Sequence, residues 1–277
     1  GPSKLRVIIR QPSANLIAPK ESHSPLNGEI KLTNEKEPFT ARFEQWQHGS
    51  WYHSNSISAK NISDLLEQLK RWTPKEEFEN KPSEFTPNKA FWAGSFAYDM
   101  VQWTQPISLQ YPPKEGEILA ILWLVDKYIV HSKNSDEIEV FSNDGNWKNL
   151  VDDLALKDYP ANTLPQQPIN EHEEQNSHTD REHMGIIEDI KSSISSGQVY
   201  QVNFGRYWSG GLVEDPKIIF QRLQESNPAP FSTLIHVEDI GLSIVSSSPE
   251  SLVRCRGGNI RTSPIKGTCE SGDSSVD

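Results

Sequence analysis

Cysteine and methionine are scarce in this chain of 277 residues, which has two of each. Cys255 and Cys269 cannot build a disulfide framework, and the sequence contains no Cys-x-x-Cys pair for redox chemistry or metal binding. This usage is typical of proteins that stay in a reducing compartment, so we expect a cytoplasmic location.

Long apolar runs and an excess of basic charge are missing as well. No stretch approaches the roughly 20 apolar residues of a membrane-spanning helix, and no secretory signal is visible. The net charge is −11, from 38 acidic and 27 basic side chains. This balance argues against a nucleic-acid partner and against an anionic membrane surface.

Motifs of several enzyme classes are also absent. The sequence has no Gly-x-Gly-x-x-Gly, no Gly-x-Ser-x-Gly and no His-Glu-x-x-His motif. Lys266 precedes Gly267, in the reverse order to a phosphate-binding P-loop, and the eight histidines show no spacing of metal ligands. The chemistry of this chain therefore has to be sought in less common patterns.

The hydrophobic patterning predicts an α+β fold. Strands are expected over residues 4–10 and 39–46, and Ser63 is expected to cap the amphipathic helix that follows. Residues 118–125 and 127–131 have the pattern of antiparallel strands. Together these elements indicate antiparallel sheets flanked by helices.

A change in composition divides the chain. Residues 157–177 contain three prolines and almost no large apolar side chains, so we predict a linker or a surface loop. It separates an N-terminal region, 1–156, from a second region, 178–277. Because the sequence stops with no element finished, we expect it to be the N-terminal portion of a longer protein.

The second region has sharper local signals. Thr179 and Glu182 form a Thr-x-x-Glu capping box at the start of a predicted helix, and Gly197 is expected to end that helix. A strand is predicted over 199–209, and Asp215 is expected to cap a second helix that has proline in its first turn. Further strands are predicted over 231–237, 241–247, 250–256 and 260–263.

The segments Ser248-Pro249-Glu250 and Pro264-Ile265-Lys266-Gly267-Thr268 carry the candidate chemistry. A hairpin that turns at 257–259 returns near its own start, so the Glu250 carboxylate and the Lys266 amine can face one pocket. A lysine nucleophile needs a lowered pKa, and a carboxylic acid that donates a proton needs a raised pKa. The same spacing also fits an ordinary ion pair at a strand end.

Five segments occur here in the order typical of one enzyme family. They are GSFAYD (94–99), GQVYQVNF (197–204), NPAPFS (227–232), SSSPE (246–250) and PIKGT (264–268). Together they resemble the chorismate-utilising enzymes, most closely component I of the aminodeoxychorismate synthases, and most densely between residues 179 and 268. The resemblance implies the fold of anthranilate synthase component I, incomplete in this chain.

The resemblance also implies a reaction, the amination of chorismate to 4-amino-4-deoxychorismate in para-aminobenzoate and folate biosynthesis. Gln201 stands where isochorismate and salicylate synthases carry a lysine that activates water, which favours ammonia. Lys266 stands where anthranilate synthases carry alanine, and it is implied to attack chorismate at C2. Glu250 is then implied to protonate the leaving hydroxyl, and Gly267 and Thr268 to bind the substrate.

Further components follow from the resemblance. A glutamine amidotransferase subunit is implied as the source of ammonia, because no glutaminase Cys-His-Glu set is visible here. Family members bind Mg²⁺ through carboxylates that we expect beyond residue 277, so this chain has no metal ligands and we expect it to be inactive by itself. Ser263 stands where the family has arginine, and the consequence of that change is open.

Many family members also bind tryptophan. Arg42, Phe43, Pro230 and Phe231 match the pattern of that pocket and are candidate tryptophan-binding residues. Two alternatives to the aminating enzyme remain. One is anthranilate synthase component I, against which Lys266 argues. The other is a non-catalytic chain that senses tryptophan or docks the amidotransferase, against which the pair of Glu250 and Lys266 argues.

Overall fold

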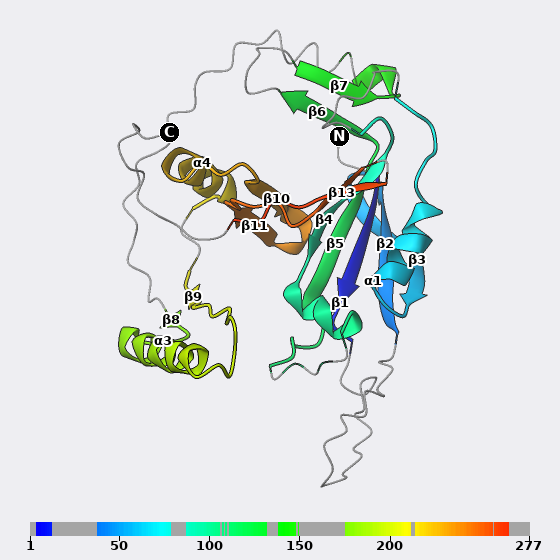
Figure 1. Ribbon diagram of the computed structural model, residues 1–277. Helices are drawn as coiled ribbons and strands as arrows, with labels where there is room; N and C mark the ends of the chain where they lie inside the picture. The colour runs from blue at the N-terminus through cyan, green and yellow to red at the C-terminus, as the bar shows by residue number, and fades with distance from the viewer. Residues whose placement is uncertain are drawn as a thin grey trace. The chain divides into compact units, whose positions relative to one another are not determined.

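The structure is a computed structural model. It describes residues 4–12, 38–78, 87–105, 107, 109, 111–131, 138–147, 149, 175–211, 214–256 and 258–265. The chain forms two compact units, Gly1–Pro160 and Ala161–Asp277 (Figure 1). Of the linker predicted over 157–177, residues 157–174 lie outside the described residues, so the linker stays a prediction. Among the described helices, none has the length and apolar character needed to cross a membrane.

A five-stranded antiparallel sheet forms the framework of the first unit, in the order β3-β2-β1-β5-β4 (Figure 1). The strands are β1 (Leu5–Arg10), β2 (Phe39–Gln47), β3 (Ser50–Ala59), β4 (Phe91–Phe96) and β5 (Ile118–Val125). Val7 in the central strand pairs with Phe43 of β2 and with Leu122 of β5. The strands predicted over 4–10, 39–46 and 118–125 are confirmed.

Strand β3 was not predicted, because its serine, histidine and asparagine side chains hide the alternation of a half-buried strand. It follows β2 through a two-residue turn at His48 and Gly49, which have φ values of +49° and +83°. Positive φ at both positions is what a tight hairpin needs to match the twist of its strands.

Helix α1 (Ile62–Lys70) packs against the sheet of the first unit. Its N-cap is Asn61, whose side chain accepts a hydrogen bond from a backbone N–H of the first turn at 2.9 Å. The prediction of Ser63 as the cap is therefore wrong, because an equally good capping residue lies two positions earlier. Leu65 and Leu69 are one turn apart and are both fully buried.

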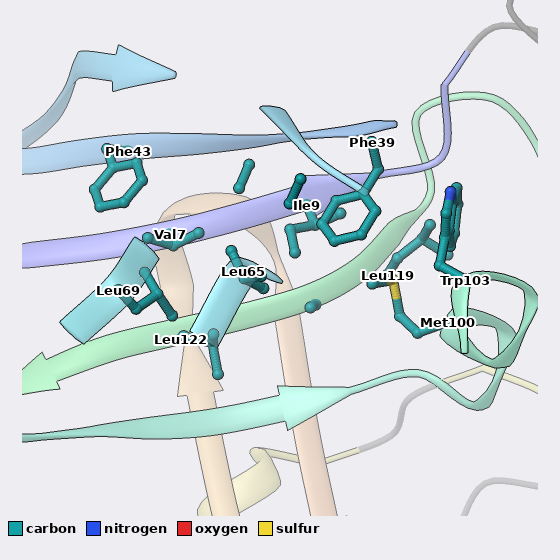
Figure 2. Packing of buried hydrophobic residues seen from close by; sticks show 13 residues of the cluster. Val7, Ile9, Phe39, Phe43, Leu65, Leu69, Met100, Trp103, Leu119 and Leu122 are labelled. Atoms are coloured by element: carbon teal, nitrogen blue, oxygen red, sulfur yellow. The ribbon is translucent and has the colours of Figure 1, made fainter. Parts of the chain in front are cut away.

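The hydrophobic core of the first unit lies between α1 and the sheet (Figure 2). It contains Val7, Ile9, Phe39, Ala41, Phe43, Ala59, Leu65, Leu69, Met100, Trp103, Leu119, Ala120 and Leu122. Phe39 meets Trp103 edge to face with ring centroids 5.3 Å apart, and Phe43 lies 4.7 Å from Trp72. Burial at about 25 cal/mol per Å² of apolar surface makes such a cluster the main source of stability.

Two further elements belong to the first unit. The hairpin of β6 (Lys127–His131) and β7 (Ile138–Ser142) confirms the strand predicted over 127–131. Its Tyr128 and Phe141 rings stack at 4.6 Å. A 3₁₀ helix over Tyr98–Trp103 carries core residues and follows β4.

The second unit consists of short hairpins and two helices in its described part. Its strands are β8 (Gln175–Asn176), β9 (Trp208–Ser209), β10 (Thr233–Val237), β11 (Leu242–Ser246), β12 (Arg254–Arg256) and β13 (Asn259–Arg261), paired in that order two by two. Its helices are α3 (Asp180–Ser195) and α4 (Pro216–Ser226), and α4 packs on β10 and β11 (Figure 1).

Local signals placed both helices of the second unit correctly. The capping box of Thr179 and Glu182 is present, and Gly197 follows α3 with a φ of +74°. Asp215 caps α4 with Pro216 at its start. The hydrogen bonds that Glu182 accepts from the Thr179 backbone and hydroxyl hold the pKa of its carboxyl below its ordinary value.

Two strand predictions in the second unit are too long. Of residues 199–209, only Trp208–Ser209 form a strand, because among the described residues only Gln175–Asn176 offers this segment a ladder partner. The strand predicted over 250–256 begins at Arg254. The α+β fold class, with antiparallel sheets flanked by helices, is confirmed.

Candidate active site

Glu250 precedes the hairpin of β12 and β13, and Lys266 follows that hairpin in the sequence. Arg254 of β12 pairs with Arg261 of β13. The ladder ends at this pair, and Glu250 and Ile265 each lie four residues beyond it along their own arms. The antiparallel pairing thus gives a physical basis for expecting the carboxylate and the amine at the same end of the hairpin.

The two arms of the hairpin stay in contact beyond the strand ladder. The hydroxyl of Thr262 donates a hydrogen bond to the carbonyl of Leu252 at 3.0 Å. Lys266, Gly267 and Thr268 themselves lie outside the described residues. Their predicted roles as nucleophile and substrate contacts therefore stay predictions.

The backbone around Glu250 is held by its neighbours. The Ser248 hydroxyl donates to the Glu250 carbonyl at 3.2 Å, and the Phe231 N–H donates to the Ser248 carbonyl at 3.1 Å. The Ser247 hydroxyl donates to the Asn227 carbonyl at 2.7 Å. Glu250 is half-buried, and within the described part of the chain its carboxylate forms no ion pair.

Gln201 lies in the segment that leads from α3 to β9. Its side chain is exposed, and its amide nitrogen donates a hydrogen bond to the Asn203 side chain at 3.3 Å. An exposed amide of this kind can also donate to a small polar ligand or accept from it. The structure places Gln201 and Glu250 in the same compact unit.

A cluster next to the Gln201 segment was missed by sequence reasoning. Arg206 forms an ion pair with Asp180, the first residue of α3, with 2.6 Å between Nη1 and Oδ1. The ring of Phe204 lies 5.5 Å from that of His178 and 5.2 Å from that of His183. These contacts span up to 26 residues of sequence, and no local pattern signals them.

The four candidate tryptophan-binding residues divide between the two units. Arg42 and Phe43 lie in β2, where neighbouring side chains point to opposite faces of the sheet. Phe43 is fully buried in the core, whereas Arg42 is exposed and pairs with Glu44 at 3.0 Å. Phe43 thus supports the core rather than a surface shared with Arg42.

Pro230 and Phe231 form the turn before β10, and both are exposed. The turn is fixed by a hydrogen bond from the Ser232 N–H to the Ala229 carbonyl at 3.2 Å. A tryptophan site built from residues of both units stays a prediction.

The described residues do not supply a metal site. They contain no group of three or more histidine, cysteine, aspartate or glutamate side chains placed to hold an ion. Ser263, where the resemblance implies an arginine, is exposed and lies two residues after the end of β13.

Comparison with known proteins defines the class to which this fold and site belong. The sequence profile of the family described as chorismate binding enzyme matches residues 33–277. The chain therefore belongs to the chorismate-binding enzyme family.

Relatives from two branches of this family are similar to the chain. Anthranilate synthase component 1 of Aquifex aeolicus is 27% identical over 241 residues, which is 81% of this chain and 48% of the relative. Aminodeoxychorismate synthase component 1 of Bacillus subtilis is 39% identical over 82 residues, which is 30% of this chain and 17% of the relative. The enzyme of the same name from Salmonella typhimurium is 37% identical over 79 residues, 28% of this chain and 17% of the relative.

A solved structure has the same fold. The crystal structure of anthranilate synthase component I from Streptococcus pneumoniae matches with a TM-score of 0.56 and 16% identity. The match covers 89% of this chain and 58% of that protein. The chain thus spans about half of the length, or less, of the relatives it matches.

Proposed function

We propose that this chain carries part of an enzyme that aminates chorismate to 4-amino-4-deoxychorismate. The observation that supports the proposal is the β12–β13 hairpin, in which Arg254 pairs with Arg261 and the Thr262 hydroxyl bonds to the Leu252 carbonyl, so that the chain turns back between Glu250 and the segment before Lys266. The identity of 37% to 39% with two aminodeoxychorismate synthase components over about 80 residues supports the same branch of the family.

The proposed chemistry has two steps. The Lys266 amine attacks C2 of chorismate, the ring double bonds shift, and the C4–O bond breaks. Glu250 gives its proton to the departing hydroxyl, which leaves as water. Ammonia then forms a bond to C4, the C2–N bond to Lys266 breaks with its electron pair returning to the lysine nitrogen, and the new C4 ammonium returns one proton to the Glu250 carboxylate. A covalent nucleophile divides one difficult substitution into two easier ones.

The proposal assigns ammonia selection to Gln201 and substrate contacts to Gly267 and Thr268. Gly267 has no Cβ, so a ligand can approach its backbone closely. A separate glutamine amidotransferase supplies the ammonia, and the product serves para-aminobenzoate and folate synthesis. The family resemblance also implies Mg²⁺. The described residues offer no carboxylate set for the ion, so no step of this chemistry is assigned to it.

The test uses the longest natural protein that carries this sequence, supplied with chorismate, an ammonium salt and Mg²⁺. Mass spectrometry of the product is expected to show 4-amino-4-deoxychorismate. Lys266→Ala is expected to reduce kcat by about 10⁴-fold or more, because the nucleophile is lost.

Lys75→Ala provides a matched control, because Lys75 is an exposed lysine of the first unit. It is expected to leave kcat unchanged. Product formation by Lys266→Ala at the parent rate contradicts the covalent step. Absence of all chorismate turnover contradicts the enzyme and favours a tryptophan-sensing or docking chain.

Anthranilate synthase is the second candidate. The anthranilate synthase of Aquifex aeolicus matches a much larger part of the chain than the aminodeoxychorismate synthases do. The same assay separates the two candidates, because anthranilate has lost the pyruvyl group that 4-amino-4-deoxychorismate keeps. Anthranilate as the product overturns the first proposal in favour of the second.

A further inference from the structure

The segment that carries Gln201 is fixed at its C-terminal end by the residues just before α3. The Ser177 N–H donates to the Tyr207 carbonyl at 2.9 Å, and the Ser177 hydroxyl accepts from the Tyr207 N–H at 3.2 Å. The pairing of β8 with β9 continues this contact. These hydrogen bonds fix the backbone of the segment at Tyr207.

Two side chains of the segment face α3. Arg206 binds Asp180 at 2.6 Å, and its guanidinium lies 4.9 Å from the ring centroid of Trp208. Only 14% of the Arg206 side chain is exposed. Phe204, two positions earlier, lies stacked on His183 of α3 with an angle of 28° between the rings. We call Asp180, His183, Phe204 and Arg206 the α3 clip.

The clip closes the loop that carries Gln201. The loop leaves the C-terminal end of α3 at Gly197, and Phe204 and Arg206 hold its far end against His183 and Asp180 near the start of the same helix. Gln201 and Asn203 lie between these two attachments, are exposed and bond to each other. The clip therefore limits the positions that the loop, and Gln201 with it, can take.

We propose that Arg206 is a positioning residue, which through Asp180 holds the segment so that Gln201 is presented to the incoming ammonia. This inference rests on the proposed aminating function for the role of Gln201. The positioning itself rests only on contacts within the second unit. The two parts can therefore fail separately.

The first experiment measures amide hydrogen exchange in the chain as it stands. Arg206→Gln and Asp180→Asn each remove one charge of the ion pair, and within residues 199–208 exchange of the Tyr207 amide, which donates to the Ser177 hydroxyl, is expected to rise roughly fivefold. Arg206→Lys keeps the charge next to Asp180 and is expected to restore much of the protection. Unchanged exchange of β10 and β11 shows that each variant is folded.

Asp189→Asn is the matched control, because Asp189 is an exposed aspartate of the same helix. It is expected to leave exchange over 199–208 unchanged. If Arg206→Gln also leaves it unchanged, or if Asp189→Asn raises it as much as Asp180→Asn does, the positioning role is overturned.

The second experiment measures steady-state kinetics in the longest natural protein that carries this sequence. Arg206→Gln is expected to raise KM for ammonium several-fold and to leave KM for chorismate unchanged, a division that general loss of structure does not produce. Faster exchange with an unchanged KM for ammonium overturns the link to ammonia. No turnover by the parent protein overturns the proposed function. The exchange result still tests whether Arg206 positions the segment.

Discussion

The two units of this chain are stabilised in different ways. The first unit buries thirteen apolar residues in one cluster between α1 and the sheet. Among the described residues of the second unit, Val237 is the one apolar side chain that is fully buried. Neither α3 nor α4 has a buried residue, and Met184 on the apolar face of α3 is 69% exposed.

This difference separates what is needed to form a helix from what is needed to bury it. Helix α3 has a complete capping box at Thr179 and Glu182, so its start in the sequence is defined locally. Its apolar face recurs at helical spacing, yet no described neighbour covers it. Local signals are thus enough to specify an element, whereas burial depends on long-range partners.

The core of the first unit should show the largest effect of a single substitution. Leu65→Ala is expected to lower the free energy of unfolding by about 3 kcal/mol, because it leaves a cavity beside Val7 and Leu69. Urea-dependent hydrogen exchange of the β1 amides measures the change.

The neighbouring residue gives a control for this prediction. Leu66 lies on the same helix and is 46% exposed. Leu66→Ala is expected to change the free energy by less than about 0.5 kcal/mol. Equal effects of the two substitutions would mean that α1 does not pack on the sheet as described.

The cap of α3 should show a smaller and more local effect. Thr179→Ala removes the side-chain acceptor for the Glu182 N–H, which lies 3.3 Å away. It is expected to destabilise the helix by about 1 kcal/mol, visible as faster amide exchange in α3 with β1 unaffected. Ser192→Ala, at an exposed position of the same helix, should not weaken it, because alanine favours helices. Faster exchange of the β1 amides in Thr179→Ala would contradict a purely local effect of this cap.

The smallest expected effect is a dependence of the stability of α3 on pH. The folded state lowers the pKa of Glu182 below its ordinary value, so the ionised carboxylate stabilises the helix above that value. This contribution is expected to disappear as the pH falls through the lowered pKa. Carboxyl NMR shifts measure the midpoint, which should rise in Thr179→Ala because a hydroxyl donor is lost. An unchanged midpoint would contradict the role of that hydrogen bond.

Much of the fold could be predicted from local sequence. The apolar alternation of β1 and the buried run of β5 identify the central strands, and caps at Thr179 and Asp215 identify α3 and α4. Strand β3 escaped prediction because its partner β2 supplies its stability while its own side chains are mostly polar. Residues 199–207 have strong strand propensity, but propensity forms no ladder without a partner.

The candidate site was predictable only in part. Motif resemblance made Glu250 and Gln201 candidates, and their roles stay predictions; the hairpin expected between Glu250 and Lys266 is confirmed with shorter strands. Asp180 and Arg206 could not be found in this way, because their contact joins positions 26 residues apart. The buried position of Phe43 was missed because an aromatic residue in a strand fits a core and a pocket equally well.

The distribution of tryptophan between the two units has a spectroscopic consequence. Seven of the eight tryptophans precede residue 161, and among them Trp72 and Trp103 contact phenylalanines of the core. The eighth, Trp208, lies beneath the guanidinium of Arg206. Intrinsic fluorescence of the chain therefore reports almost entirely on the first unit. The emission of Trp208 alone, in a background where the other seven are replaced, would act as an optical reporter of the α3 clip.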